Sequence, residues 1–181
     1  MEFLSFSTIW IMWNALQAEP VPGEMSFEAA ERAFADGHYE RALENYRDVL
    51  AENPEAVEAM RGKARSFLQT GHLADAVDWF DRAVEREPEF AGTYLNRGIA
   101  HDLAGDYEAA LADYERAIAL NKSVADGPGW LTRLLHMNEP PPTVIDRAVY
   151  LEEQLDLPED ERVLSIRDED TAQRGYRQRL E

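Results

Sequence analysis

Histidine, aspartate and glutamate are the residues of this sequence that could bind a metal ion or transfer protons. The four histidines are His38, His72, His101 and His136. A zinc site on a helix requires ligands on one helix face, as in the HExxH pattern, which this sequence lacks. His38 and His72 each follow a glycine, and 34 residues separate them. This spacing is typical of a turn residue repeated with a structural unit, so we expect no metal site.

The carboxylates are too numerous for any one pair of them to indicate acid–base catalysis. The sequence has 36 aspartate and glutamate residues, and solvent-exposed helix faces produce carboxylate pairs freely. The GxSxG pattern and a phosphate-binding loop ending in GK[ST] are both missing. Gly127-Pro128-Gly129 lacks the third glycine of a dinucleotide-binding fingerprint. We therefore predict a protein that is not an enzyme, with no catalytic residues, no cofactor and no metal.

The composition favours a folded, acidic protein. Apolar residues make up 45% of the 181 residues, which is enough for a hydrophobic core despite a net charge of −18. That charge repels phosphate backbones, and no basic stripe opposes it, so we expect no nucleic-acid partner. The sequence has no cysteine, which excludes disulfides and thiolate zinc ligands.

A period of 34 residues organises the middle of the chain into blocks 23–56, 57–90 and 91–124. Alanine recurs at Ala42, Ala76 and Ala110, and a large ring recurs at Tyr46, Phe80 and Tyr114. Gly37, Gly71 and Gly105 each separate two amphipathic runs. A small residue on one helix lets a ring of its neighbour approach the backbone, so each block is predicted to be a pair of antiparallel helices. The fold class is therefore all-α.

The blocks resemble the tetratricopeptide repeat (TPR) family, whose 34-residue unit has small residues, an aromatic residue and a late proline at set positions. Pro54 and Pro88 match the late proline, whereas block three has Lys122 there. Block one departs at Ser26 and Ala33. The resemblance implies a solenoid of three helix-turn-helix repeats over 23–124, followed by C-terminal capping helices in 125–181.

In this family, the first helices of successive repeats line a concave groove that binds a peptide or helix of another protein. The resemblance implies an apolar floor crossed by two arginines, which could hold a partner's carboxylate. Packing inside the array is the alternative for each apolar residue. The expected groove residues are Phe27, Glu31, Phe34, Arg61, Arg65, Leu68, Leu95, Asn96, Ile99, Asp102 and Leu103.

One subset of the family does not fit. TPR co-chaperones that hold the C-terminal carboxylate of heat-shock chaperones use lysine, arginine and asparagine at five groove positions. This chain has Phe27, Glu31, Gly62, Gly92 and Asn96 at those positions. Only Asn96 keeps suitable chemistry, so we expect that the carboxylate clamp is missing.

The residues after the repeats are expected to cap the array. Trp130-Leu131 and Leu134-Leu135 suit one face of a first capping helix. Thr143-x-x-Asp146 is a capping-box pattern, and it predicts a second helix with Val144, Ala148, Leu151 and Leu155 on one stripe. Arg174, Arg177 and Arg179 lie in a tail that we expect to fold back onto the protein's own acids.

The N-terminal segment 1–22 is apolar from Phe3 to Leu16, which is too short to span a membrane as one helix. Three interpretations stay open. The segment is signal-like but starts with Glu2 instead of a basic residue. It could equally tether the protein to a membrane through residues 3–16, or pack as a helix on the repeats or in their groove.

The predicted function is a non-enzymatic scaffold or adaptor that binds another protein in the groove. A role in a bacterial cell envelope is suggested by the N-terminal segment and by residues 93–114, which resemble repeats of outer-membrane TPR lipoproteins. The alternative is a soluble cytoplasmic chaperone or regulator whose own N-terminal helix occupies the groove until a client displaces it.

Overall fold

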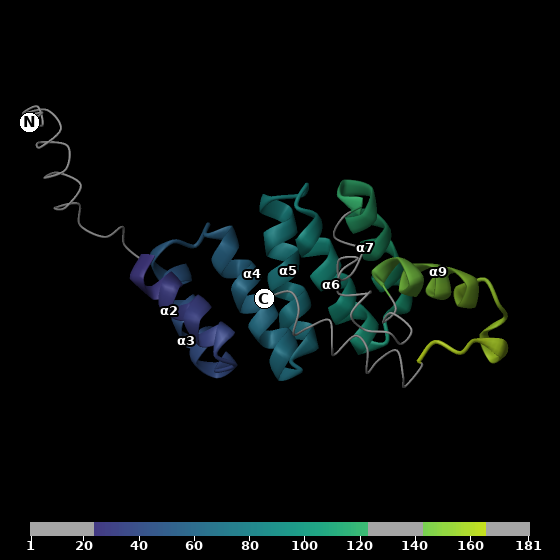
Figure 1. The fold of residues 1–181 in the computed structure, drawn as a ribbon, viewed down its shortest axis with the longest axis horizontal. Coiled ribbons are helices and arrows are strands. Elements are labelled where there is room, and N and C mark those ends of the chain that lie inside the picture. Colours follow the sequence, from purple (N-terminus) through teal and green to yellow (C-terminus); the bar gives the residue numbers. More distant parts are fainter. Residues whose placement is uncertain (1–23, 123–142, 166–181) are drawn as a thin grey trace, which may run out of the picture.

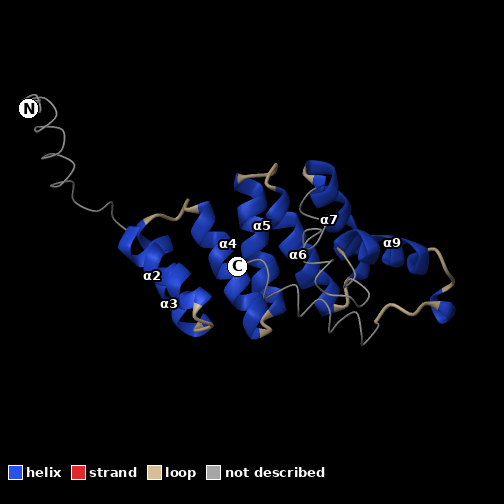
Figure 2. Cartoon of the chain, viewed as in Figure 1, coloured by secondary structure: helices blue, strands red, loops and turns tan. Residues whose placement is uncertain are grey.

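Three helical hairpins follow one another in the computed structural model, which describes residues 24–122 and 143–165. The hairpins are α2 (Glu24–Ala35) with α3 (Tyr39–Glu52), α4 (Val57–Thr70) with α5 (Leu73–Arg86), and α6 (Ala91–Ala104) with α7 (Tyr107–Leu120). After them come α9 (Val144–Leu155) and a short 3-10 turn, η2 (Glu159–Glu161). The described residues are helices and loops without a strand (Figure 2). The predicted all-α solenoid is confirmed.

Glycine closes each hairpin at the same place. Gly37, Gly71 and Gly105 have φ values of 76°, 80° and 84°, a left-handed conformation that disfavours a Cβ atom. In the second hairpin, the N–H of Gly71 donates to the carbonyl of Leu68, which satisfies one free carbonyl at the end of α4. Identical turns give the three hairpins the same geometry, and this allows them to stack.

The core is built from the alanine and ring columns of the sequence. Ala42, Ala76 and Ala110 are all 0% exposed, and each lies in the first turn of the second helix of its repeat. In the third repeat, a Cβ atom on Gly98 would lie 2.8 Å from the ring of Tyr114. The rings therefore do approach the backbone through small residues, as the sequence predicts.

The helices α2 to α7 stand side by side in chain order, and α9 lies at the far end of the row (Figure 1). Each second helix packs against the first helix of the next repeat. Arg97 on α6 links three helices, because its guanidinium lies 2.6 Å from Asp81 on α5 and 2.6 Å from Asp113 on α7. The two carboxylates raise the pKa of Arg97, so this seam is held by a permanent charge.

The second predicted capping helix is confirmed as α9, which packs against α7. Thr143 and Asp146 form the predicted capping box at its start. Val144, Ala148 and Leu151 join the same core cluster as the second and third repeats, and Leu155 is half-buried. α7 ends at Leu120 even though Lys122 replaces the late proline.

Several predicted features lie outside the described residues. These are the segment 1–22, the first capping helix at Trp130–Leu135 and the arginines of the tail. Within the described part of the chain, no helix has the length and apolar character needed to cross a membrane.

Candidate groove between the first helices

An open hollow of about 310 Å³ lies along the first helices of the three repeats. We call it the first-helix groove. It combines two aromatic rings with two acidic and two basic side chains, an asparagine and a glycine. Its lining residues are Phe27, Glu31, Glu58, Arg61, Arg65, Phe90, Gly92 and Asn96.

Arg61 lies at the centre of this groove and is already paired. Its guanidinium donates to Glu87 at 2.7 Å and to Glu58 at 3.1 Å. The same group lies 4.2 Å from the centre of the Phe90 ring, a distance suited to a cation–π interaction. Phe90 itself is 48% exposed, so it offers an apolar surface to a partner.

Arg65 pairs across the first two repeats with Glu31, 3.1 Å away. Arg65 also lies 4.6 Å from the centre of the Phe34 ring. The buried Tyr46 hydroxyl donates to the same carboxylate of Glu31. Burial, followed by this hydrogen bond and the charge of Glu31, raises the pKa of Tyr46. A partner's carboxylate would therefore have to exchange with Glu31, Glu58 or Glu87 to reach either arginine.

The apolar floor expected from sequence is divided between groove and core. Phe27 lines the groove. Four others are at most 5% exposed and belong to the core clusters, namely Phe34, Leu68, Leu95 and Ile99. Leu103 is half-buried against the same core. For these five residues, the structure therefore agrees with the alternative, which is packing inside the array of repeats.

Asp102 does not line the groove, because it is buried under α9. Arg147 donates to its two carboxylate oxygens at 2.9 Å and 2.7 Å. Tyr114 donates its hydroxyl to Asp102 at 3.1 Å. Burial and the carboxylate of Asp102 raise the pKa of Tyr114 well above its usual value. The role of Asp102 in this structure is to hold the capping helix.

Asn96 lines the groove near its third-repeat end, and its side-chain amide donates to the carbonyl of Gly92 at 2.8 Å. Gly62 lies elsewhere: a Cβ atom there would be 2.2 Å from the ring of Tyr46. Gly62, one of the five clamp positions, therefore packs in the core and does not line the groove.

Sequence reasoning missed Phe90 and Glu87, which lie in the loop between the second and third repeats. Phe90 is a large apolar residue directly before α6, in a loop otherwise rich in acids and proline. That contrast was the available signal for it. His38 and His72 occupy the N-cap positions of α3 and α5, as expected of repeated turn residues. No cluster of three or more potential metal ligands occurs in the regions that the structure describes.

Sequence patterns described as Tetratricopeptide repeat match residues 27–91 and 91–123, which together cover more than half of the chain. The chain belongs to the tetratricopeptide repeat family. Among curated relatives, it is similar to the Protein SGT1 homolog of Oryza sativa subsp. japonica, with 30% identity over 106 residues. That match covers 59% of this chain and 28% of the relative. The chain thus spans less than a third of the length of this relative.

Solved TPR structures share the fold. The first TPR of Spaghetti (RPAP3), bound to the HSP90 peptide SRMEEVD, matches with a TM-score of 0.55 and 22% identity. That match covers 64% of this chain and 89% of the other. The MamA protein matches with a TM-score of 0.54 and 25% identity, covering 58% of this chain and 57% of the other. Both structures support the repeat architecture described above.

Proposed function

We propose that this protein is a non-enzymatic adaptor that binds a peptide or an amphipathic helix of another protein in the first-helix groove. The observation that carries the proposal is the open hollow in which the exposed ring of Phe90 lies beside the paired guanidinium of Arg61. The RPAP3 structure, in which a TPR domain of the same fold holds a peptide, supports a protein partner.

The groove chemistry describes the segment that would bind. Phe27 and Phe90 favour apolar side chains. Arg61 is paired with Glu58 and with Glu87, and Arg65 is paired with Glu31, so both charge signs are present at the groove. A partner with both charge signs and one or two apolar anchors fits this pattern. Because a partner's carboxylate must replace an existing ion pair, and because association itself costs free energy, we expect an affinity no tighter than about micromolar.

The double variant Arg61→Glu/Arg65→Glu tests the groove. Reversal places two further carboxylates beside Glu31, Glu58 and Glu87, so the partner's own carboxylate should be repelled and the partner captured at least tenfold less. The measurement is affinity capture from a lysate of the source organism, followed by mass spectrometry and repeated at two salt concentrations.

The matched control is Arg32→Glu/Arg41→Glu, which changes the charge equally at two exposed arginines outside the groove lining. Thermal unfolding of both variants by circular dichroism checks that the fold is retained. If the groove variant, still folded, captures the same partners with the same salt sensitivity as the wild-type chain, the groove proposal is wrong.

The place of action stays a prediction, and deletion of residues 1–18 separates its two versions. A tether in the cell envelope predicts that the truncated protein leaves the membrane fraction and binds its partner with unchanged affinity. Occupation of the groove by the N-terminal helix of a cytoplasmic regulator predicts tighter partner binding after truncation. Cell fractionation, together with titration of the captured partner, distinguishes the two.

A further inference from the structure

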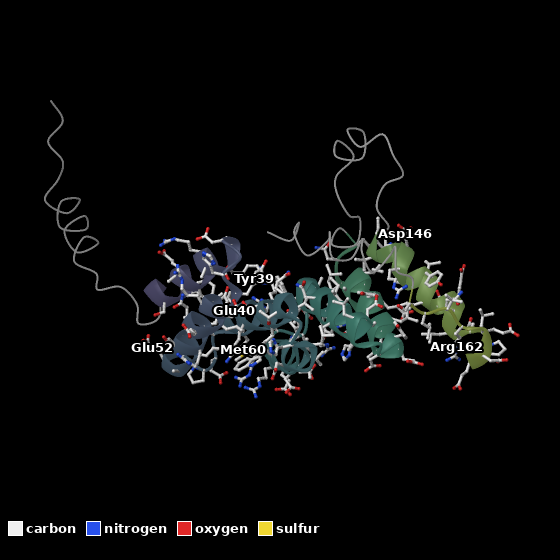
Figure 3. The ribbon with its side chains drawn as sticks, turned by 90° about the horizontal axis from the view of Figure 1, so that it is seen from below. Tyr39, Glu40, Glu52, Met60, Asp146 and Arg162 are labelled. Carbon is white, nitrogen blue, oxygen red and sulfur yellow. The ribbon has the colours of Figure 1, made fainter. Side chains whose placement is uncertain are left out.

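A second hollow, of about 440 Å³, lies between the second helices of the first two repeats. We call it the α3–α5 hollow. Its apolar lining is Leu50, Pro54, Met60 and Trp79, and its charged rim is Glu55, Arg82, Glu85 and Arg86. Figure 3 shows Met60 at this edge of the stack, with nitrogen-bearing side chains nearby. Its residues are distinct from those of the first-helix groove.

The 34-residue period explains why this hollow exists. Met60 occupies the same repeat position as Tyr94, and Pro54 the same position as Pro88. Between the second and third repeats, the ring of Tyr94 reaches across the seam and donates its hydroxyl to the carbonyl of Pro88 at 3.0 Å. The unbranched side chain of Met60 has no such ring. At this repeat position, an aromatic side chain is therefore present at one seam and missing at the other.

The charges differ between the two seams in the same way. Lys63 occupies the repeat position of Arg97, which binds Asp81 and Asp113. At the earlier seam, those two carboxylates are replaced by Arg47 and Trp79. The Lys63 ammonium lies 4.1 Å from the centre of the Trp79 ring. Among the described residues, no carboxylate forms an ion pair with Lys63.

Further cations surround Trp79. Arg82 lies 4.3 Å from the centre of its ring. Burial, then the charges of Arg82 and Arg47, lower the pKa of Lys63, whereas the charge of Asp75 opposes them. At the other end of the rim, Arg86 is paired with Glu55. The Trp79 end of the hollow is thus a local site of unpaired positive charge on a chain whose net charge is −18.

We propose that the α3–α5 hollow binds a segment of a partner protein that carries one bulky apolar side chain and a carboxylate close to it. The apolar side chain would occupy the space that Tyr94 fills at the next seam, against Pro54 and Met60. The carboxylate would pair with Arg82 at the Trp79 end of the hollow, where Lys63 contacts the same ring. Glu85 on the rim disfavours a uniformly acidic segment, so the partner carries its carboxylate on one side only. This site is independent of the first-helix groove.

The test uses the full chain labelled with ¹³C at the lysine Cε atoms. Lys63 and Lys122 are the only lysines of the sequence. The Lys63 signal reports on the Trp79 ring that lines the hollow, and the Lys122 signal is an internal control. The probe is a synthetic dodecapeptide of glycine and serine with one tyrosine and one aspartate two residues before it. We expect a saturable shift of the Lys63 signal, a rise in the pKa of Lys63, and no change at Lys122.

Two variants and one matched control define the site. Met60→Tyr introduces the side chain that Tyr94 has at the equivalent position of the next repeat. This ring should fill the hollow and weaken peptide binding at least tenfold. Arg82→Glu should do the same by removing the cation beside Trp79. Arg116→Glu changes the residue equivalent to Arg82 one repeat later and should leave binding unchanged.

Four results would overturn the proposal. They are an unmoved Lys63 signal in the wild-type chain, equal binding by Met60→Tyr, equal weakening by Arg116→Glu, and equal binding of a peptide with alanine in place of tyrosine. Self-association of the wild-type chain that Met60→Tyr abolishes would assign the hollow to a second copy of the chain instead.

Discussion

Replacing Arg147 with alanine is expected to lower the free energy of unfolding by about 3–5 kcal/mol, the largest effect of a single substitution that we predict. The Arg147 and Asp102 side chains are 5% and 0% exposed. Without the guanidinium, the carboxylate of Asp102 would stay buried with the Tyr114 hydroxyl as a remaining donor. An uncompensated buried charge is costly, and separation of α9 from α7 would relieve it.

Urea unfolding followed by circular dichroism measures this effect. The double variant Asp102→Leu/Arg147→Met removes both charges and keeps the side-chain volume. A well-packed apolar pair can replace a buried ion pair at little cost. The buried Tyr114 hydroxyl, however, loses its acceptor. We therefore expect the double variant to lose about 1–3 kcal/mol, less than Arg147→Ala loses. A loss below about 1 kcal/mol for Arg147→Ala would show that α9 does not depend on this pair.

Gly62→Ala is expected to have the second largest effect, a loss of about 3 kcal/mol from overpacking. A Cβ atom at position 62 would lie 2.2 Å from the ring of Tyr46, which is fully buried. The ring cannot move alone, because its hydroxyl is bound to Glu31, and Glu31 is paired with Arg65. The substitution should therefore disturb the first-helix groove as well as the core.

Gly92→Ala is the matched control for Gly62→Ala. A Cβ atom there would lie 2.8 Å from the ring of Phe90, which is half-exposed and can turn away. Alanine also favours a helix over glycine by about 1 kcal/mol, so we expect Gly92→Ala to be neutral or slightly stabilising. Chemical denaturation of both variants tests the pair, and a stabilised Gly62→Ala would mean that Tyr46 is not confined.

The repeat architecture could be predicted from the sequence because its signals are local and occur three times. Gly71 needs a left-handed turn, Ala76 needs a close neighbour, and Thr143 with Asp146 marks a helix start wherever the helix packs. Each of these follows from backbone geometry within a few residues. Repetition at 34 residues then places the helices side by side without further information.

The groove was harder to predict because two faces of each first helix are apolar. Phe27 and Leu68 follow the same spacing, yet Phe27 lines the groove and Leu68 lies in the core. Helical periodicity predicts the face of the helix on which a side chain lies. It does not predict whether a neighbouring helix covers that face. Whether Arg65 is free or paired depends on Glu31, which lies 34 residues away. That pairing depends on how closely the repeats approach, and one sequence does not supply this distance.

The sequence wrongly predicts Asp102 in the groove for the same reason, since its partner Arg147 comes from a helix 45 residues later. No local signal connects Arg147 with α6. The α3–α5 hollow had a signal that could have been used, because Met60 breaks the column that Tyr94 belongs to. A comparison of side-chain volumes at equivalent positions of successive repeats indicates a space at that seam.

The position of α9 also limits how copies of this protein can assemble. The last repeat of an open solenoid exposes the apolar surface by which each repeat packs on the next one. Head-to-tail addition of further copies through that surface leads to filaments. Here α9 covers α7, and its arginine neutralises the acid on α6. Because α9 already covers this end of the row of repeats, we expect the protein not to form filaments by head-to-tail addition through it.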